Sequence, residues 1–515
     1  MSELADRKLR YVGLGLVAGV GAGVLSLTAM MNSAFAYGDV EAGSEPVPFT
    51  MPEYTQVMGG SGLPIPSLAP GYTKAADTLF IAPNLPETTP QDLNTPENLY
   101  PLYPPTFSTS LEKQLPFDVS VAEGVSILNS KIDPGLTSGT SEGVFGYSQS
   151  STISSLEMEQ LDPSGTPSSL PANFVLIGDP NLPNGGLLAR FPDLSLPSLG
   201  ITFSGATPAD DFPTAIYTIQ YDGFADFPRY PIDLLADVNA FLGIETLHGH
   251  YLDLTTEQVK NATLLPGSMS DGATDSMTNY YLIDTAGTTL NPTGLPLANL
   301  IYGIPVVGHP LAALLTPDLT YLVNLGYGAD NLGYSDTPFN VETPFGLFPD
   351  VSPLTVLENL ATYTQQGVTD FIHSISSGGL SLSALPDPAA ALAGLTQLAT
   401  DPAAALAALS PADILSGLTT AVDTLSNALS TTYAALLPTA DIANALLTSL
   451  PAYDLTLFGQ GIESIPTEGI SGLINAVGLP IAADVALGTL AAGFEFTVVE
   501  GTLSQVIGDV SSLLP

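Results

Sequence analysis

The stretch Val144-Phe-Gly-Tyr-Ser148-Gln-Ser-Ser-Thr152 joins a short β-rich run to a serine-rich segment with helical spacing. A glycine two residues before a serine, with a small residue two after it, permits a tight turn from a strand into a helix, because larger side chains there would clash. Gly146 and Ser150 hold these two positions, with serine in place of the second glycine. The stretch therefore predicts a nucleophile elbow at Ser148, followed by a helix over 149–161.

Strand-like and helix-like segments alternate around this elbow. The sequence predicts a strand from Tyr54 that runs into a glycine turn, further strands at Thr78–Pro83, Gly143–Tyr147, Ala172–Gly178 and Ala215–Tyr221, and a partly helical segment over 107–131. This alternation indicates an α/β fold with a mostly parallel sheet. Residues 180–214 have the Pro/Gly/Leu-rich composition of a loop or lid.

The chain divides by composition into five parts. We expect a signal peptide or membrane anchor at 1–36, a linker at 37–53, a catalytic α/β domain at 54–335, a connecting segment at 336–375 and an Ala/Leu-rich helical region at 376–515. In the last part Asp387-Pro-Ala-Ala-Ala-Leu-Ala393 recurs at 401–407, and Asp followed by Pro is a typical helix start. That region is expected to be either a helical appendage without chemistry or a surface for lipid or an envelope partner.

Composition excludes several functions. The 515 residues carry a formal net charge of −42 with 51 acidic and 9 basic residues, which argues against nucleic acid as a partner. There is no cysteine and there are only four histidines, so disulfides and thiolate chemistry are excluded, and neither a metal site nor another cofactor is expected. The oligomeric state is left open.

The N-terminus has the pattern of an export segment. Arg7, Lys8 and Arg10 precede an uncharged run from Tyr11 to Met31, and Ala34-Phe35-Ala36 offers a cleavage site. The run is also long enough to span a membrane, so both a cleaved signal and a retained anchor are open. Basic residues on its N-terminal side predict that the rest of the chain is exported to the cell envelope or secreted.

A serine nucleophile needs a base and an acid that orients the base. The strand before Asp222 ends in Asp222-Gly-Phe-Ala-Asp226, and we favour Asp226 over Asp222 as the acid, because Gly223 makes a turn before it; Asp179 is a third choice. His248 in Leu247-His-Gly-His-Tyr251 is the expected base, with His250 as the alternative. The backbone N–H of Gln149 and a donor from Ser61, in the turn Gly59-Gly-Ser-Gly62, would form the oxyanion hole.

Several of these stretches together resemble one family. They are Val57–Pro66, Asn94-Thr-Pro-Glu97, Gly146–Ser150, Val175–Asn181, Pro183–Pro192, Gln220–Pro228, His248-Gly-His-Tyr251 and Val323–Tyr327. From residue 55 to about 330 the chain resembles the PE-PPE domain of mycobacterial proteins, a cutinase-like serine α/β-hydrolase. The resemblance implies a triad of Ser148, Asp226 and His248, although the motif does not decide between Asp222 and Asp226.

The resemblance and the residues together predict an exported serine hydrolase that cleaves lipid-like acyl esters. An export segment stands where a PE or PPE module is usual, and this arrangement resembles membrane-associated members proposed to move acyl groups onto trehalose glycolipids. An acyltransferase of that kind is therefore one alternative, and a catalytically inactive envelope protein on a hydrolase fold is another. The expected partners are an acyl ester or glycolipid and membrane or envelope lipid.

Reporter fusions after residue 60 test the predicted export. Alkaline phosphatase is active only outside the cytoplasm, so its fusion should be active, whereas a fusion to a reporter that works only in the cytoplasm should be silent. The basic flank Arg7–Arg10 is the reason to expect this orientation. The opposite pattern of activities would place the catalytic domain in the cytoplasm and remove envelope lipids as substrates.

Overall fold

The computed structural model describes residues 51–511, apart from 103–113, 166, 336 and 378–437, and the side chains beyond residue 500 are not described. The expected export segment, the linker up to residue 50 and the Asp-Pro repeats lie outside the described residues.

A seven-stranded sheet organises the domain, in the order β2-β1-β3-β4-β7-β9-β8. All neighbouring strands run parallel except β8, which is antiparallel to β9. The strands are β1 (Tyr54–Val57), β2 (Thr89–Asp92), β3 (Glu142–Tyr147), β4 (Ala172–Ile177), β7 (Thr214–Ile219), β8 (Thr263–Leu264) and β9 (Thr278–Ile283). The predicted α/β fold with a mostly parallel sheet is confirmed.

Four of the five predicted strands are present, as β1, β3, β4 and β7. The strand predicted at Thr78–Pro83 is wrong, because that segment forms the helical turns η2 (Asp77–Ile81) and α3 (Ala82–Asn84). Leu79, Phe80 and Ile81 are all buried there, and three consecutive buried residues are as compatible with a helical turn as with a strand. The sequence pattern also missed β2, β8 and β9.

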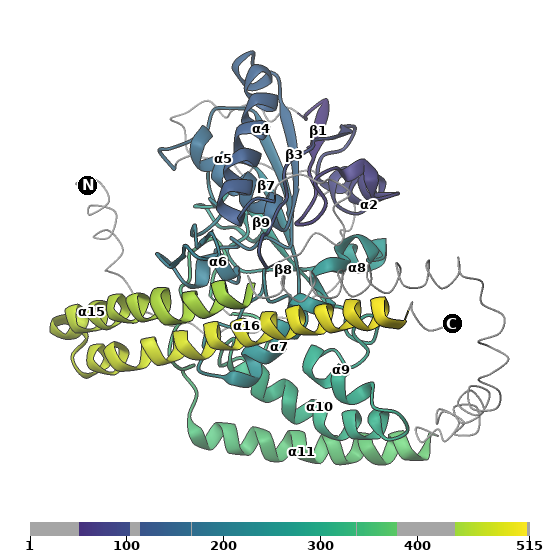
Figure 1. Cartoon of the computed structure of the whole chain (residues 1–515), viewed down its shortest axis with the longest axis vertical. Coiled ribbons are helices and arrows are strands. Elements are labelled where there is room, and N and C mark those ends of the chain that lie inside the picture. Colours follow the sequence, from purple (N-terminus) through teal and green to yellow (C-terminus); the bar gives the residue numbers. More distant parts are fainter. Residues whose placement is uncertain (1–50, 103–113, 166, 336, 378–437, 512–515) are drawn as a thin grey trace, which may run out of the picture. The chain divides into compact units, whose positions relative to one another are not determined.

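Helices cover both faces of the sheet. Phe174 and Leu176 of β4 pack in one core with α4 (Phe117–Thr137) and α5 (Gln149–Leu161), whereas Val175 and Ile177 pack in the other, with Tyr251. Both faces are therefore apolar, as is usual for a parallel sheet. Other helices in the described ranges include α2 (Tyr72–Ala76), α7 (Leu234–Thr246), η3 (His248–Asp253), α8 (Thr256–Lys260), α9 (Pro296–Tyr302), α10 (Gly308–Leu325) and α11 (Pro353–Ser376) (Figure 1).

The apolar insert 180–214 is part of the core and does not form an open lid. It contains the short helix α6 (Leu187–Arg190) and a hairpin of β5 (Ser195–Leu196) and β6 (Ile201–Thr202). Leu182, Leu187 and Phe191 are buried among the side chains of the larger core cluster. The high apolar content of the insert is explained by this packing.

The described C-terminal residues, from 438 onward, are helical, as predicted. A long antiparallel pair consists of α15 (Leu450–Glu468) and α16 (Ile470–Ser511), joined at Gly469 (Figure 1). Gly461 lets α15 approach the backbone of Ala476 on α16, and Gly493 of α16 lies against the Phe241 ring of α7. Among the described residues, Ile470–Glu500 is the one helical stretch whose length and mean hydropathy of 1.7 would suit a membrane span.

Two glycines of α15 test this helix pair. A Cβ at Gly461 would overlap Ala476, whereas a Cβ at Gly459 would meet nothing within 4 Å. We expect Gly461→Ala to lower the free energy of unfolding by about 1–3 kcal/mol through overpacking. Gly459→Ala should instead raise it by about 0.5–1 kcal/mol, because alanine favours the helix. Thermal or urea unfolding measures both, and equal effects would contradict the packing of α15 on α16.

Candidate active site

Four loops meet at the carboxyl edge of the sheet, because β1, β3, β4 and β7 are neighbours and parallel. The glycine turn follows β1, Ser148 follows β3, Gly178 follows β4 and Asp222 lies just beyond β7. This is the edge at which open α/β sheets hold their ligands.

Ser148 lies between β3 and α5 with φ of +56° and ψ of −117°, a conformation that non-glycine residues rarely adopt. A Cβ at Gly146 would lie 2.7 Å from the carbonyl oxygen of Ser150, so glycine is required there. Ser150 accepts a hydrogen bond from the Tyr147 N–H at 2.8 Å through its Oγ. The serine that replaces the usual second glycine therefore supports the turn, and the strained elbow is present at the predicted position.

His248 lies beside Ser148, with Nε2 2.7 Å from the serine Oγ. One hydrogen bond holds the histidine backbone, and one glycine leaves room for its ring. The Tyr147 hydroxyl donates to the carbonyl oxygen of His248, and a Cβ at Gly178 would lie 3.1 Å from His248 Cε1. Gly178 has φ of +55°, so a glycine at the end of β4 both makes the turn and leaves room for the imidazole ring.

The carboxylate that contacts His248 is Asp222, and the preference for Asp226 is wrong in this respect. Asp222 Oδ2 and Oδ1 lie 2.8 and 3.0 Å from His248 Nδ1. The Tyr251 hydroxyl also donates to Asp222 Oδ2 at 2.7 Å, and the Phe224 N–H donates to Oδ1 at 3.1 Å. The buried carboxylate thus has three donors, as a buried anion requires.

Asp226 forms the turn instead. Its Oδ2 accepts the Tyr221 N–H at 2.8 Å, and Tyr221 has a positive φ of 67°. Burial raises the pKa of Asp226 to about 8, although the Tyr221 N–H and the charge of Arg190 oppose the rise. Arg190 itself is fully buried and donates to the carbonyl oxygens of Phe227 and Thr343. Asp226 and Arg190 therefore hold the loop whose other end carries Asp222.

The two remaining alternatives lie elsewhere. Asp179 is buried and accepts hydrogen bonds from the Asn181 N–H and the Thr207 hydroxyl, and burial raises its pKa to about 6. The His250 side chain is 43% exposed and pairs with Asp253, with 2.8 Å between Nδ1 and Oδ2. Neither residue hydrogen-bonds to Ser148 or Asp222.

The two predicted oxyanion residues are next to each other. Gln149 begins α5 immediately after Ser148, and its Nε2 lies 3.1 Å from Ser61 Oγ. The Gln149 amide also donates to the Asn98 carbonyl oxygen at 2.8 Å and accepts from the Ser120 hydroxyl at 2.7 Å. Ser61 Oγ is the acceptor in this hydrogen bond, so the contact with Gln149 does not use the Ser61 hydroxyl proton.

Sequence reasoning missed two supporting residues. Tyr251, three residues after His248, has its hydroxyl bonded to Asp222 and to the Ile219 N–H. Glu97 lies below the glycine turn, where its carbonyl oxygen accepts the Gly62 N–H and burial raises the pKa of its carboxyl to about 8. Both belong to stretches that carry the family resemblance, but their partners are distant in sequence and no local pattern predicts them.

An elbow serine between a central parallel strand and a helix is characteristic of the α/β-hydrolase fold. The chain belongs to the PE-PPE domain family, whose family model matches residues 86–328. It is 44% identical over 466 residues to the PPE family protein PPE28 of Mycobacterium tuberculosis, which is 89% of this chain and 67% of that protein.

Two other relatives come from the same organism. The chain is 36% identical over 449 residues to a protein named esterase PE16, covering 84% of this chain and 76% of the relative. It is 40% identical over 335 residues to the PE family protein PE3, covering 64% and 65%. No solved structure matches the chain.

Matched Asp→Asn substitutions distinguish the two carboxylates. Asp222→Asn removes the anion at His248 Nδ1 and should lower esterase turnover on the order of 10⁴-fold. Asp226→Asn should change turnover at pH 7 far less, because the amide resembles the protonated carboxyl that burial favours. A larger loss from Asp226→Asn would return the acid role to that residue.

The same Asp226 variant has an expected pH signature. A carboxyl whose pKa is higher in the folded protein than in the unfolded chain binds more protons in the folded state. It therefore lowers stability progressively as pH rises from about 4 to about 8. Urea unfolding of Asp226→Asn should therefore show a smaller loss of stability over this range than the parent protein. Parallel pH profiles for the two proteins would contradict the burial of a neutral Asp226.

Proposed function

We propose that this protein is a serine esterase that cleaves acyl esters through Ser148, His248 and Asp222. The observation that carries the proposal is the continuous chain of contacts, 2.7 Å from Ser148 Oγ to His248 Nε2 and 2.8 Å from His248 Nδ1 to Asp222 Oδ2. The relative named an esterase supports the same reaction class.

In the proposed reaction, Ser148 Oγ attacks the ester carbonyl carbon while His248 Nε2 takes the serine proton. The Gln149 N–H and the Ser61 hydroxyl donate to the oxygen that becomes negative. His248 then returns the proton to the leaving alcohol, and an ester between the acyl group and Ser148 remains. Water, deprotonated by His248, attacks this acyl-enzyme and releases the carboxylic acid and Ser148.

Asp222 keeps the proton of His248 on Nδ1, so that Nε2 is free to accept the serine proton. The strained backbone of Ser148 projects its hydroxyl out of the sheet toward His248, and the site is thus arranged before any substrate arrives. We further propose that the enzyme works outside the cytoplasm on envelope lipids, on the ground of the basic flank and apolar run at 7–31.

Labelling with a fluorophosphonate tests the nucleophile. The parent protein should be labelled at Ser148, and Ser148→Ala should abolish labelling and lower turnover about 10⁴–10⁶-fold with the fold intact. Ser150→Ala is the matched control, because Ser150 only supports the turn and should lose far less. Absence of labelling in the folded parent protein would indicate an inactive scaffold.

Product analysis tests the acceptor. A long-chain acyl ester offered alone should yield the free fatty acid by mass spectrometry, and adding a sugar should leave that product dominant. If the acyl group were instead found on the sugar, the proposed reaction would be acyl transfer and not hydrolysis. The proposed roles of Ser148, His248 and Asp222 would be the same in both reactions.

A further inference from the structure

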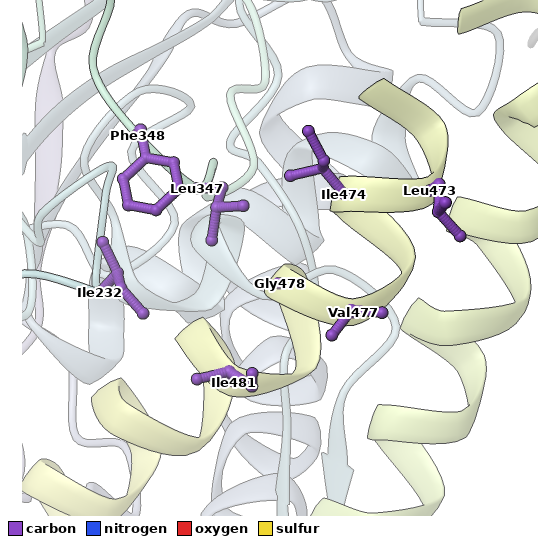
Figure 2. Close-up of a pocket in the computed structure, with 8 residues that line it drawn as sticks. All are labelled: Ile232, Leu347, Phe348, Leu473, Ile474, Val477, Gly478 and Ile481. Atoms are coloured by element: carbon purple, nitrogen blue, oxygen red, sulfur yellow. The ribbon is translucent and has the colours of Figure 1, made fainter. Parts of the chain in front are cut away.

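Five apolar side chains lie exposed together where α16 begins. They are Phe348, Leu473, Ile474, Val477 and Ile481, here called the α16 apolar patch, and each is between 49% and 64% exposed. They surround a shallow hollow of about 430 Å³ whose lining contains only apolar residues (Figure 2). A monomeric soluble protein rarely exposes large apolar side chains in one contiguous group.

The patch joins two segments that the fold holds together. Leu347 packs against Gly478 of α16. A Cβ at position 478 would overlap the Leu347 side chain. The loop before Phe348 is tied to the hydrolase domain, because the Gly346 N–H donates to the Arg229 carbonyl oxygen at 2.7 Å and the Phe345 N–H donates to that of Arg190 at 3.0 Å. The two backbone segments that carry the exposed side chains are therefore held next to each other.

Charge restricts what the patch can contact. No charged residue occurs from Ile470 to Ala483, and the sequence contains no lysine or arginine after Lys260. With a net charge of −42, the protein is repelled by an anionic lipid surface. A protein partner would be expected to need hydrogen-bonding groups at the patch, and its lining side chains supply none.

The same helix continues to the candidate active site. Phe494 of α16 stacks on Phe224 with 6.4 Å between ring centroids, and Phe224 meets the His248 ring edge-on at 4.7 Å. A surface bound at the start of α16 is thus connected through one continuous helix to the residues beside the proposed catalytic histidine.

We propose that the α16 apolar patch docks the enzyme onto the surface of a lipid layer that carries no net charge. The patch enters the layer with α16 still packed on the hydrolase domain, which presents the site to lipid-borne esters. The proposal rests on the proposed esterase function for its purpose, but the docking itself can be measured without catalysis.

The absence of tryptophan from the chain permits a local probe. In the full chain, Ile474→Trp should show a blue-shifted emission with phosphatidylcholine vesicles and quenching when the lipid is brominated. Ile127→Trp on the exposed side of α4 is the control and should show neither, although it carries the same N-terminal segment. Absence of quenching at Ile474→Trp, or equal quenching at both positions, would overturn the proposal.

Anionic lipid and self-association provide two further outcomes. Adding phosphatidylglycerol should weaken the Ile474→Trp response, and a stronger response would contradict docking to an uncharged layer. A blue shift without vesicles, together with a dimer in light scattering, would assign the patch to a second copy of the chain and overturn the lipid proposal.

A charged substitution separates docking from catalysis. Ile474→Glu should reduce the vesicle-bound fraction about tenfold or more, because an apolar side chain is lost from the contact. Hydrolysis of long-chain esters in vesicles should fall in parallel, whereas hydrolysis of a short soluble ester should be unchanged. Ile127→Glu should alter neither the vesicle-bound fraction nor the hydrolysis of vesicle esters. If Ile474→Glu lost hydrolysis of the soluble ester as well as of the vesicle ester, a docking role would be overturned. If the parent protein hydrolysed neither ester, only the esterase proposal would be contradicted.

Discussion

The carboxylate of Asp222 is fully buried, and donors from two segments must reach it together. His248 and Tyr251 come from η3, and the Phe224 N–H comes from the loop after β7. Leaving a buried carboxylate without such donors would cost several kcal/mol. The need for donors to Asp222 therefore determines both how η3 packs on the sheet edge and where the candidate catalytic histidine lies. Tyr251 adds to this packing, because its hydroxyl also accepts the last N–H of β7.

The two acids of the loop after β7 have different roles because each is buried among different partners. Asp222 meets hydrogen-bond donors from side chains distant in sequence, whereas Asp226 meets the backbone of its own turn. Their order in the sequence gives no sign of this difference, because Gly223 makes a turn compatible with either residue. The elbow at Ser148 could be predicted, since its requirements lie within five consecutive residues. The acid could not be predicted with the same certainty, since its assignment depends on where η3 packs.

The elements of the fold likewise differ in whether their own residues or their distant partners determine them. β3 and α5 were predictable from their own periodicity, and α5 has the expected bounds. The segment at Thr78–Pro83 cannot be assigned from its own pattern, because a short buried apolar run fits both a strand and a helical turn. β9 is not evident from the sequence although Tyr280 and Leu282 are buried, because the strand begins with the polar residues Thr278 and Asn279, which are buried as well. Its place beside β7 is decided by pairing across more than sixty residues.

The C-terminal helices are more than an appendage, although the family model ends at residue 328. Ala482, Ala483, Ala486 and Leu487 of α16 are buried in the same core cluster as β3 and β4, and Phe494 reaches the aromatic contact beside His248. Small side chains at these positions let a long helix lie close to the domain, which explains the alanines on this side of α16. The apolar side chains on the other side of α16 have no such packing to explain them. Burial on the domain accounts for one side of the helix, and the lipid docking proposed above would account for the exposed apolar side chains on the other.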